Sequence, residues 1–200
     1  MSTTTILVTD VNGQPRSWST LEEACCYYAR GKVRWGVGTS VHTFLGGHNL
    51  NGEQSRIDIE PVLGVTGPLV GTEWLDRTSV YVERKILYNR DLCICAYCGQ
   101  QIKPYLLTID HILPKSRGGK NIWQNAVSAC KSCNHAKGNR TPEEWGVKLL
   151  YVPYVPTCAE KYIMKARNIL ADQMDFLVAS VPRHSRLFDV DGKIRPLYNG

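Results

Sequence analysis

The sequence has no long apolar run, and this absence sets the first limits on its function. Among its 200 residues no stretch of about 18 is continuously apolar, which is roughly what a helix needs to cross a bilayer. The N-terminus also lacks the charged segment followed by an apolar one that marks a secretory signal. We therefore expect neither a membrane span nor a signal peptide, and no membrane partner.

Cysteine, by contrast, is not scarce, since the sequence contains eight. Without a secretory segment, this number argues for a reducing compartment and for metal binding rather than disulfides. The overall composition, 43% hydrophobic and 21% charged, is that of an ordinary globular protein. A cytoplasmic, metal-binding protein is the expectation.

Four of the cysteines form two pairs, Cys95-x2-Cys98 and Cys130-x2-Cys133, with 31 residues between the pairs. The ligand type and the spacing are typical of a closed tetrahedral zinc site. Four thiolates leave no position for water or substrate, so this zinc is expected to be structural and to contribute folding free energy, on the order of 10 kcal/mol in small modules. The alternatives are disulfides or unrelated buried thiols. Cys93 is a second candidate for the first ligand, and we choose Cys95 because it gives the two-residue spacing.

Polar residues between and beside these pairs are the candidates for catalysis. Residues 106–109 are predicted to form a short strand, residues 114–119 a loop, and residues 134–137 the start of a helix. A second strand between loop and helix gives the order strand, loop, strand, helix. The candidate residues along this order are Asp110, His111, Asn125 and Asn134.

These residues resemble the HNH nuclease family, whose ββα-metal fold is also called the His-Me finger. The match is Asp110-His111 for the first element, Asn125 for the second, and Asn134 in a third position that many members fill with histidine or asparagine. The nine-residue step from Asn125 to Asn134 and the following Asn-x2-Lys, ending at Lys137, are similar to the HNH domains of RNA-guided nucleases. The flanking sequence more loosely resembles bacterial and phage single-chain HNH endonucleases.

Phosphodiester hydrolysis gives each of these residue types a reason. His111 suits the general base, because an imidazole with an ordinary pKa of about 6.5 is largely neutral at pH 7. Asp110 and Asn134 offer oxygen ligands for Mg²⁺ or another divalent cation that stabilises the charge of the transition state. The resemblance implies that Asn125 braces the loop and orients the base.

The strand itself limits this arrangement. Successive side chains of a regular strand point to opposite faces, so Asp110 and His111 cannot both reach one phosphate from an undistorted strand. The strand must therefore bend or end at this point. Gly118 and Gly119 allow the following loop to approach a nucleic-acid backbone closely.

The positive charge is concentrated in the half of the chain that holds the motif. Residues 1–100 have 9 Lys and Arg against 10 Asp and Glu, a balance of −1, whereas residues 101–200 have 15 against 8, a balance of +7. This asymmetry favours DNA as the partner, with a merely solvated basic surface as the alternative. The predicted phosphate contacts are Lys115, Arg117, Lys137 and Arg140, with Arg84, Lys85 and Arg90 as further candidates, and His135 is expected to be solvated or to face a phosphate.

The expected fold class is α+β: a ββα-metal nuclease core with a four-cysteine zinc site, flanked by an N-terminal α/β region and a C-terminal helix. Residues 1–84 are predicted to form a strand, a helix capped from Ser19, and short strands with a long loop near residues 46–52. Residues 85–146 form the nuclease module, approached by a helix over residues 78–90. Residues 147–200 hold one helix, starting at Thr157, whose apolar stripe continues to Leu177 and either docks on the core or forms a homodimer.

The predicted function is therefore a metal-dependent HNH endonuclease that hydrolyses DNA. The main alternative is a non-catalytic, zinc-stabilised nucleic-acid-binding module, which would need the cysteines and the basic surface but not Asp110, His111 and Asn134 in this arrangement. A zinc enzyme of another kind is less favoured, because thiolates fill all four zinc positions.

Overall fold

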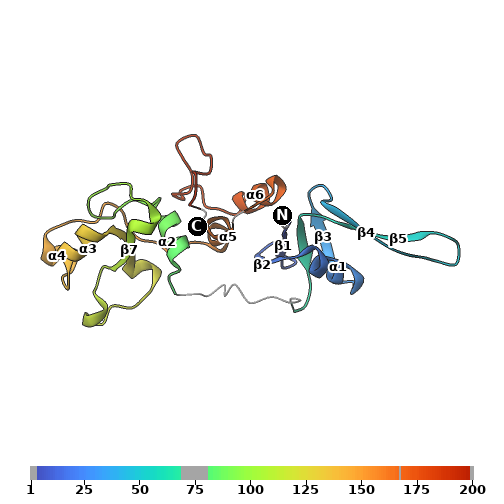
Figure 1. Ribbon diagram of the computed structural model, residues 1–200, viewed down its shortest axis with the longest axis horizontal. Helices are drawn as coiled ribbons and strands as arrows, with labels where there is room; N and C mark the ends of the chain where they lie inside the picture. The colour runs from blue at the N-terminus through green and yellow to red at the C-terminus, as the bar shows by residue number, and fades with distance from the viewer. Residues whose placement is uncertain (1–3, 69–80, 167, 199–200) are drawn as a thin grey trace. The chain divides into compact units, whose positions relative to one another are not determined.

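The computed structural model describes residues 4–68, 81–166 and 168–198 (Figure 1). The described residues fall into two compact units. Unit 1 contains residues 4–68 and 168–180, and unit 2 contains residues 81–166 and 181–198. Residues 147–200, expected as one region, are therefore shared between the two units.

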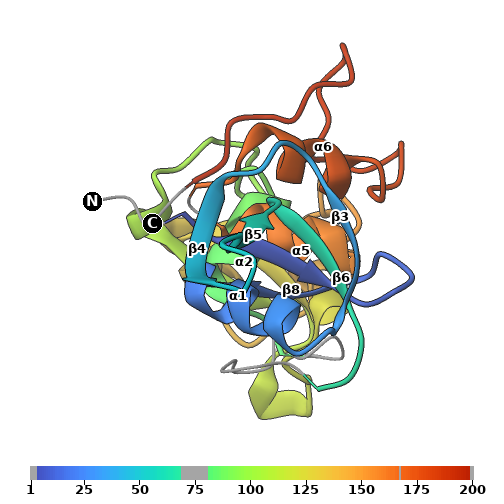
Figure 2. The same cartoon turned by 90° about the vertical axis from the view of Figure 1, so that its right-hand side faces the viewer.

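A four-stranded sheet forms the centre of unit 1 (Figure 2). Its strand order is β2-β1-β6-β3, with β1 parallel to β6 and the other two pairs antiparallel. The short Asn12-Gly13 turn connects the first two strands. The strands are β1 (Ile6–Thr9), β2 (Pro15–Ser19), β3 (Val33–Val37) and β6 (Val62–Val65).

Helix α1 (Leu21–Ala29) covers one face of this sheet. It begins at a capping box in which the Thr20 side chain accepts a hydrogen bond from the Glu23 backbone N–H, and the Glu23 carboxylate accepts one from the Thr20 N–H. The cap is therefore Thr20, one residue later than predicted. Ala24 and Tyr27 of the helix pack into a core made by alternate residues of the strands: Ile6, Val8, Leu63 and Val65.

Helix α6 (Ala171–Val178) packs in the same unit against the sheet. The buried Gln173 side chain donates hydrogen bonds to the carbonyls of Thr5, at 2.7 Å, and Pro61, at 2.9 Å. The ring of Phe176 lies 5.9 Å from that of Trp35 on β3. These contacts join a C-terminal segment to the N-terminal sheet.

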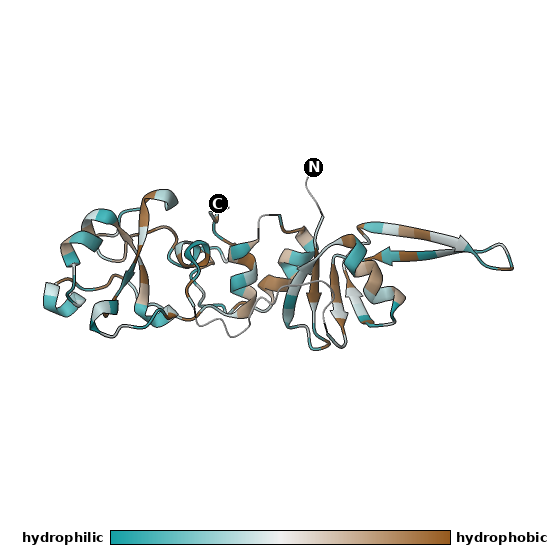
Figure 3. Cartoon of the chain, turned by 60° about the horizontal axis from the view of Figure 1, so that its bottom comes forward, coloured by the Kyte–Doolittle hydropathy of each residue, from teal (hydrophilic) through white to brown (hydrophobic). Residues whose placement is uncertain are grey.

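A two-stranded hairpin, β4 (His42–His48) and β5 (Gln54–Ile59), extends from this core (Figure 3). Phe44 and Ile57 pack against the core at its base, whereas Leu50 at the tip is fully exposed. The loop predicted near residues 46–52 is shorter than expected, because strand pairing continues to His48. Residues 69–72, also expected in this region of short strands, lie outside the described residues.

Unit 2 has the predicted order of strand, loop, strand and helix. Strand β7 (Leu107–His111) pairs antiparallel with β8 (Ala126–Cys130), with Asp110 opposite Val127 and His111 opposite Ala126. Helix α3 (Lys131–Lys137) follows β8 directly. It starts earlier than the predicted residue 134, because the Cys130 sulfur caps it by accepting a hydrogen bond from the Cys133 backbone N–H at 3.4 Å.

Helix α2 (Arg84–Arg90) is fixed to β8 by hydrogen bonds from Arg90 and Asp91, which form a buried ion pair with each other at the end of the helix. The Arg90 guanidinium donates to the carbonyls of Ala126, Trp123 and Tyr154, at 2.7 to 2.9 Å. Asp91 accepts from the Ser128 backbone N–H at 2.7 Å. The prediction that Arg90 contacts DNA is therefore wrong, because its side chain is completely buried.

The other two basic residues of α2 are more accessible than Arg90. Arg84 is exposed. Lys85 is half-buried, and its ammonium donates to the Lys165 carbonyl at 2.9 Å. The helix begins later than predicted, since residues 81–83 precede it and residues 78–80 lie outside the described residues.

The predicted single C-terminal helix is two helices. After α4 (Pro142–Trp145), helix α5 (Cys158–Lys165) starts at the expected Thr157 cap and ends where Ala166 adopts an extended conformation. Its apolar residues Ala159, Tyr162 and Ile163 are buried within unit 2, so a homodimer would need a different surface. Among the described residues, no helix is long and apolar enough to cross a bilayer.

Candidate active site

The four paired cysteines come together in unit 2. Their sulfur atoms, from Cys95, Cys98, Cys130 and Cys133, all lie within 4.8 Å of one another. Tetrahedral zinc with Zn–S bonds of about 2.3 Å would hold its sulfurs about 3.8 Å apart, so this donor set fits a zinc ion with at most a small contraction. The cluster is consistent with the predicted structural zinc site.

Hydrogen bonds favour the thiolate form at one of these ligands. Burial acts to raise the pKa of Cys130, but hydrogen bonds with the Ser132 hydroxyl, at 3.1 Å, and the Cys133 backbone N–H outweigh it and lower the pKa to about 7. Burial raises the pKa of Cys98 and of Cys133. The cluster therefore offers a zinc ion one thiol, that of Cys130, which readily loses its proton near neutral pH. The thiolate is the form of cysteine that binds zinc.

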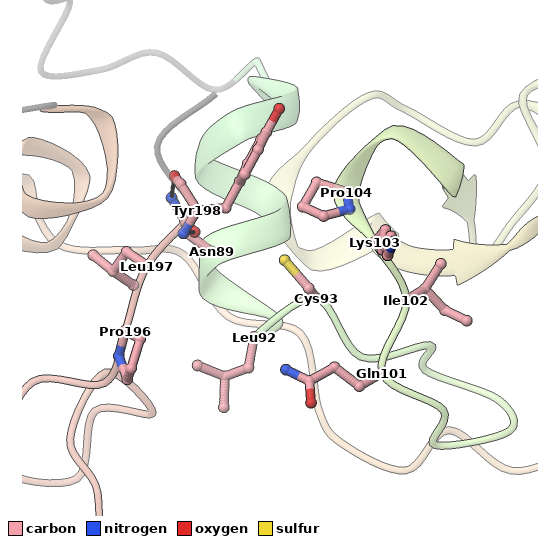
Figure 4. Close-up of a pocket in the computed structure, with 10 residues that line it drawn as sticks. All are labelled: Asn89, Leu92, Cys93, Gln101, Ile102, Lys103, Pro104, Pro196, Leu197 and Tyr198. Atoms are coloured by element: carbon pink, nitrogen blue, oxygen red, sulfur yellow. Dashed lines mark hydrogen bonds between the residues drawn. The ribbon is translucent and has the colours of Figure 1, made fainter.

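Cys93 is not part of this cluster. It lines a separate pocket of about 440 Å³, beside Asn89 of α2, Pro104 and Tyr198 near the C-terminus (Figure 4). Burial raises the pKa of its thiol, which disfavours a thiolate. The choice of Cys95 as the first ligand is therefore consistent with the structure.

The Asp110 carboxylate is buried and is held from two sides. The Tyr97 hydroxyl donates a hydrogen bond to Oδ2, and the Lys137 ammonium lies 3.1 Å from Oδ1. Lys137 also donates to the His111 carbonyl at 2.8 Å. Burial and the adjacent carboxylate raise the pKa of Tyr97, so its hydroxyl remains a donor at neutral pH.

Lys137 therefore differs from its predicted position. Its place in the sequence, one turn after Asn134, predicts a phosphate contact. The structure buries its side chain completely, because that side of α3 packs on β7 and pairs the ammonium with Asp110.

Asn134 lies on the same face of β7 as Asp110. Its amide nitrogen donates to the Thr108 hydroxyl at 2.9 Å, and Thr108 is two residues before Asp110 on the strand. The Asn134 oxygen, the atom that a hard cation takes, is not used in that bond. A shallow hollow of about 460 Å³ lies here, lined by Thr108, Lys131, Asn134, His135 and Gly138.

His111 is the last residue of β7, so the strand ends there, one of the two outcomes expected. Regular pairing up to this residue turns its side chain to the face opposite Asp110. The imidazole Nε2 lies 3.0 Å from the Asn121 side-chain oxygen. The structure thus places the two adjacent candidates on different faces at one strand end.

Asn125 spans the loop between the two strands with three hydrogen bonds. Its oxygen accepts from the Leu113 N–H at 2.8 Å, and its amide nitrogen donates to the carbonyls of Leu113, at 3.1 Å, and Lys120, at 2.9 Å. Both ends of the segment 113–120 are thereby tied to one side chain. This segment directly follows His111.

Of the four residues predicted on and beside the motif to contact phosphate, Lys115, Arg117 and Arg140 are exposed and Lys137 is buried. The Arg117 guanidinium is paired with the Glu144 carboxylate, with a second contact at 2.9 Å. Arg140 donates to the Ala136 carbonyl, at 2.6 Å, at the end of α3. Lys115 lies in the 3₁₀ helix Lys115–Arg117 of the loop, and His135 on α3 is also exposed, as expected.

Comparison with known proteins identifies this region. Residues 95–150 match the HNH endonuclease family. The chain carries an HNH endonuclease domain. The matched segment contains all four zinc-site cysteines and the four polar candidates, Asp110, His111, Asn125 and Asn134.

A 58-residue segment of the HNH-containing chain is also 40% identical to the CRISPR-associated endonuclease Cas9 of Corynebacterium diphtheriae. The match covers 28% of this chain and 5% of that Cas9. The chain thus shares one segment with a much longer protein.

Two residues of this site were not predicted from the sequence. Tyr97 stands between the zinc-site residues Cys95 and Cys98, and this position is the one signal that marks it. Asn121, which contacts His111, has no such signal, because its position depends on how the loop folds back.

Proposed function

We propose that this chain is a metal-dependent endonuclease that hydrolyses phosphodiester bonds in DNA. The observation that carries the proposal is the HNH endonuclease match over residues 95–150. The basic excess of residues 101–200 supports a polyanionic substrate. In this proposal His111 is the catalytic base, and the structural zinc holds the module together.

His111 would take a proton from the attacking water. Because β7 ends at His111, the proposal places the phosphate across this strand end, where it faces both the imidazole and the cation held by Asp110 on the other face. Nε2 faces the Asn121 oxygen, which only accepts hydrogen bonds, so the neutral imidazole carries its proton on Nε2. Nδ1 then holds the lone pair that accepts a proton. Asn121 therefore selects the tautomer, and Asn125 fixes the loop that follows the base.

Asp110 and Asn134 would hold Mg²⁺ or another divalent cation. Both offer oxygen donors from the same face of the ββα unit, a donor set that suits a hard cation. When bound, this ion supplies positive charge that stabilises the developing charge on the phosphate and leaving oxygens. The buried position of Asp110 strengthens its interaction with a cation.

Lys115, Arg117 and Arg140 are the proposed phosphate contacts around this site. Lys115 is exposed and lies in the loop beyond His111. Arg117 would exchange its Glu144 partner for phosphate, which it can bind with two parallel hydrogen bonds. Such contacts position the backbone without reading sequence.

The test is conversion of supercoiled plasmid to nicked or linear DNA by the zinc-loaded protein, with Mg²⁺ and with EDTA. We expect conversion by wild type with Mg²⁺ alone, and its loss in His111→Ala. His184→Ala is the matched control, because His184 is an exposed histidine of the same unit outside the HNH match. DNA retarded on a gel but left intact with Mg²⁺, Mn²⁺ and Ni²⁺ would instead support the non-catalytic binding module.

A further inference from the structure

Tyr97 connects the four-cysteine cluster to the Asp110 carboxylate. It stands between Cys95 and Cys98, so its backbone belongs to the turn that supplies two zinc ligands. Its side chain is 6% exposed, and its ring packs edge-on against that of Trp145, with centroids 5.3 Å apart. The hydroxyl at the end of this ring donates to Asp110 Oδ2.

The second partner of this carboxylate also comes from a zinc-binding segment. Lys137 lies one turn after Cys133 on α3, the helix that Cys130 caps. Its ammonium contacts Oδ1, the other oxygen of Asp110. The two zinc-binding segments therefore hold one carboxylate between them, each through a different oxygen.

The two partners differ in what a divalent cation would do to them. A neutral hydroxyl on Oδ2 can stay in place when a cation binds the carboxylate. An ammonium on Oδ1 carries the same sign of charge as the cation, so the two compete for that oxygen. Tyr97 is thus the partner that can orient Asp110 both without and with the metal.

We propose that Tyr97 is a positioning residue that acts through Asp110, fixing the carboxylate by Oδ2 so that a divalent cation can replace Lys137 at Oδ1. This inference rests on the proposed function in one respect, that Asp110 is a metal ligand. Hydrogen-bonding partners of a ligating carboxylate typically contribute a factor of about 10 to 100 in metal affinity. Tyr97 couples the cation site to the zinc cluster in this way.

The test is Mn²⁺ affinity, measured on the zinc-loaded full chain by the electron paramagnetic resonance signal of free Mn²⁺, without DNA. Tyr97→Phe keeps the ring against Trp145 and removes only the hydroxyl. We expect its Mn²⁺ dissociation constant to rise about tenfold or more, with unchanged zinc content. Asp110→Asn should abolish the same Mn²⁺ site.

Tyr88→Phe is the matched control. Tyr88 is a buried tyrosine of the same unit whose hydroxyl donates to the Leu107 carbonyl at 2.9 Å, at the other end of β7. Tyr88→Phe therefore also removes a tyrosine hydroxyl that bonds to β7, but this hydroxyl does not contact the Asp110 carboxylate. We expect Mn²⁺ affinity within about a factor of two of wild type, since no partner of the carboxylate changes.

The outcomes separate this inference from the nuclease proposal. Equal Mn²⁺ affinity in Tyr97→Phe and wild type overturns the positioning role, even if wild type cleaves DNA. Equal losses in the Tyr97 and Tyr88 variants also overturn it, since a general loss of rigidity would then explain both. Absence of an Asp110-dependent Mn²⁺ site overturns it as well. A loss of Mn²⁺ affinity in Tyr97→Phe but not in Tyr88→Phe supports the positioning role, whether or not wild type cleaves plasmid.

Discussion

The Lys137 ammonium lies 3.1 Å from Asp110 Oδ1, and the two side chains are 0% and 7% exposed. A charge buried this deeply depends on its partner, because desolvation costs several kcal/mol per ion and is offset only by the pairing. The pair holds α3 on β7, and it neutralises a carboxylate that is proposed to bind a cation.

Lys137→Met should destabilise the protein by about 3–5 kcal/mol, because it leaves the Asp110 carboxylate buried without its ammonium partner. Mn²⁺ should recover part of this loss by supplying the missing positive charge. Urea unfolding with and without Mn²⁺ measures both effects. Lys148→Met, the same change at an exposed residue of unit 2, should alter stability little. Indistinguishable unfolding of the two variants would contradict a stabilising ion pair.

The four-cysteine cluster predicts one zinc per chain. Cys95→Ser should lower the zinc content and destabilise unit 2, since structural zinc contributes folding free energy. Cys93→Ser should keep the zinc, because Cys93 lines a different pocket. Metal analysis of the purified variants, together with their thermal unfolding, decides between the two cysteines. Retained zinc in Cys95→Ser, with loss in Cys93→Ser, would reverse the assignment.

Asn125→Ala should loosen the segment 113–120, because it removes three hydrogen bonds that tie both ends to one side chain. The expected cost is about 1–3 kcal/mol. Limited proteolysis should cut this segment faster, and plasmid cleavage should fall while zinc content stays the same. Gln124→Ala, at the exposed neighbouring position, serves as the control. Wild-type cleavage and proteolysis in Asn125→Ala would count against the bracing role.

Arg90→Lys should lower stability without weakening DNA binding. Lysine keeps the charge but cannot reproduce the guanidinium bonds to three carbonyls and the paired contact with Asp91. Thermal unfolding and gel shifts of the folded variant, compared with Arg84→Lys at an exposed position of the same helix, separate the two properties. A loss of DNA affinity in Arg90→Lys but not in Arg84→Lys would instead indicate that Arg90 contacts the DNA backbone.

Glu144→Gln should strengthen DNA binding by releasing Arg117 for phosphate. The Arg117 guanidinium and the Thr141 backbone N–H hold the pKa of Glu144 at about 2. A depressed pKa keeps the pair ionised above that value, so it is lost only as the pH falls through about 2. The gain in affinity should therefore be the same at pH 6 and pH 8. Glu143→Gln makes the same charge change without an Arg117 contact, and an equal gain there would contradict the release of Arg117.

Local spacing predicted much of this site, because its signals lie within short segments. The Cys-x2-Cys pairs required only that each turn aim two sulfurs at one point, and the four sulfurs do converge. The order of strand, loop, strand and helix followed from the apolar runs and the glycines between them, and β7, β8 and α3 have that order.

The remaining features depend on contacts between distant segments. The spacing of Asn134 and Lys137 predicts that they share one side of the helix. It does not predict that this side packs on β7, where Lys137 contacts Asp110. The sequence gives no sign that Arg90 is buried. Its burial depends on four hydrogen-bonding partners, three carbonyls and the Asp91 carboxylate. The three carbonyls belong to residues more than 30 positions away in the sequence. The apolar stripe after Thr157 continues across Ala166, although the chain there leaves one unit for the other.

The most direct test of the central proposal is the initial rate of supercoiled-plasmid nicking by wild type and His111→Ala under identical conditions, with zinc-loaded protein and saturating Mg²⁺. Removal of a general base typically lowers the rate by a factor of about 10² to 10⁴. We expect a loss in this range for His111→Ala, with unchanged zinc content and DNA binding. Equal nicking rates for the two proteins would contradict the assignment of His111 as the base.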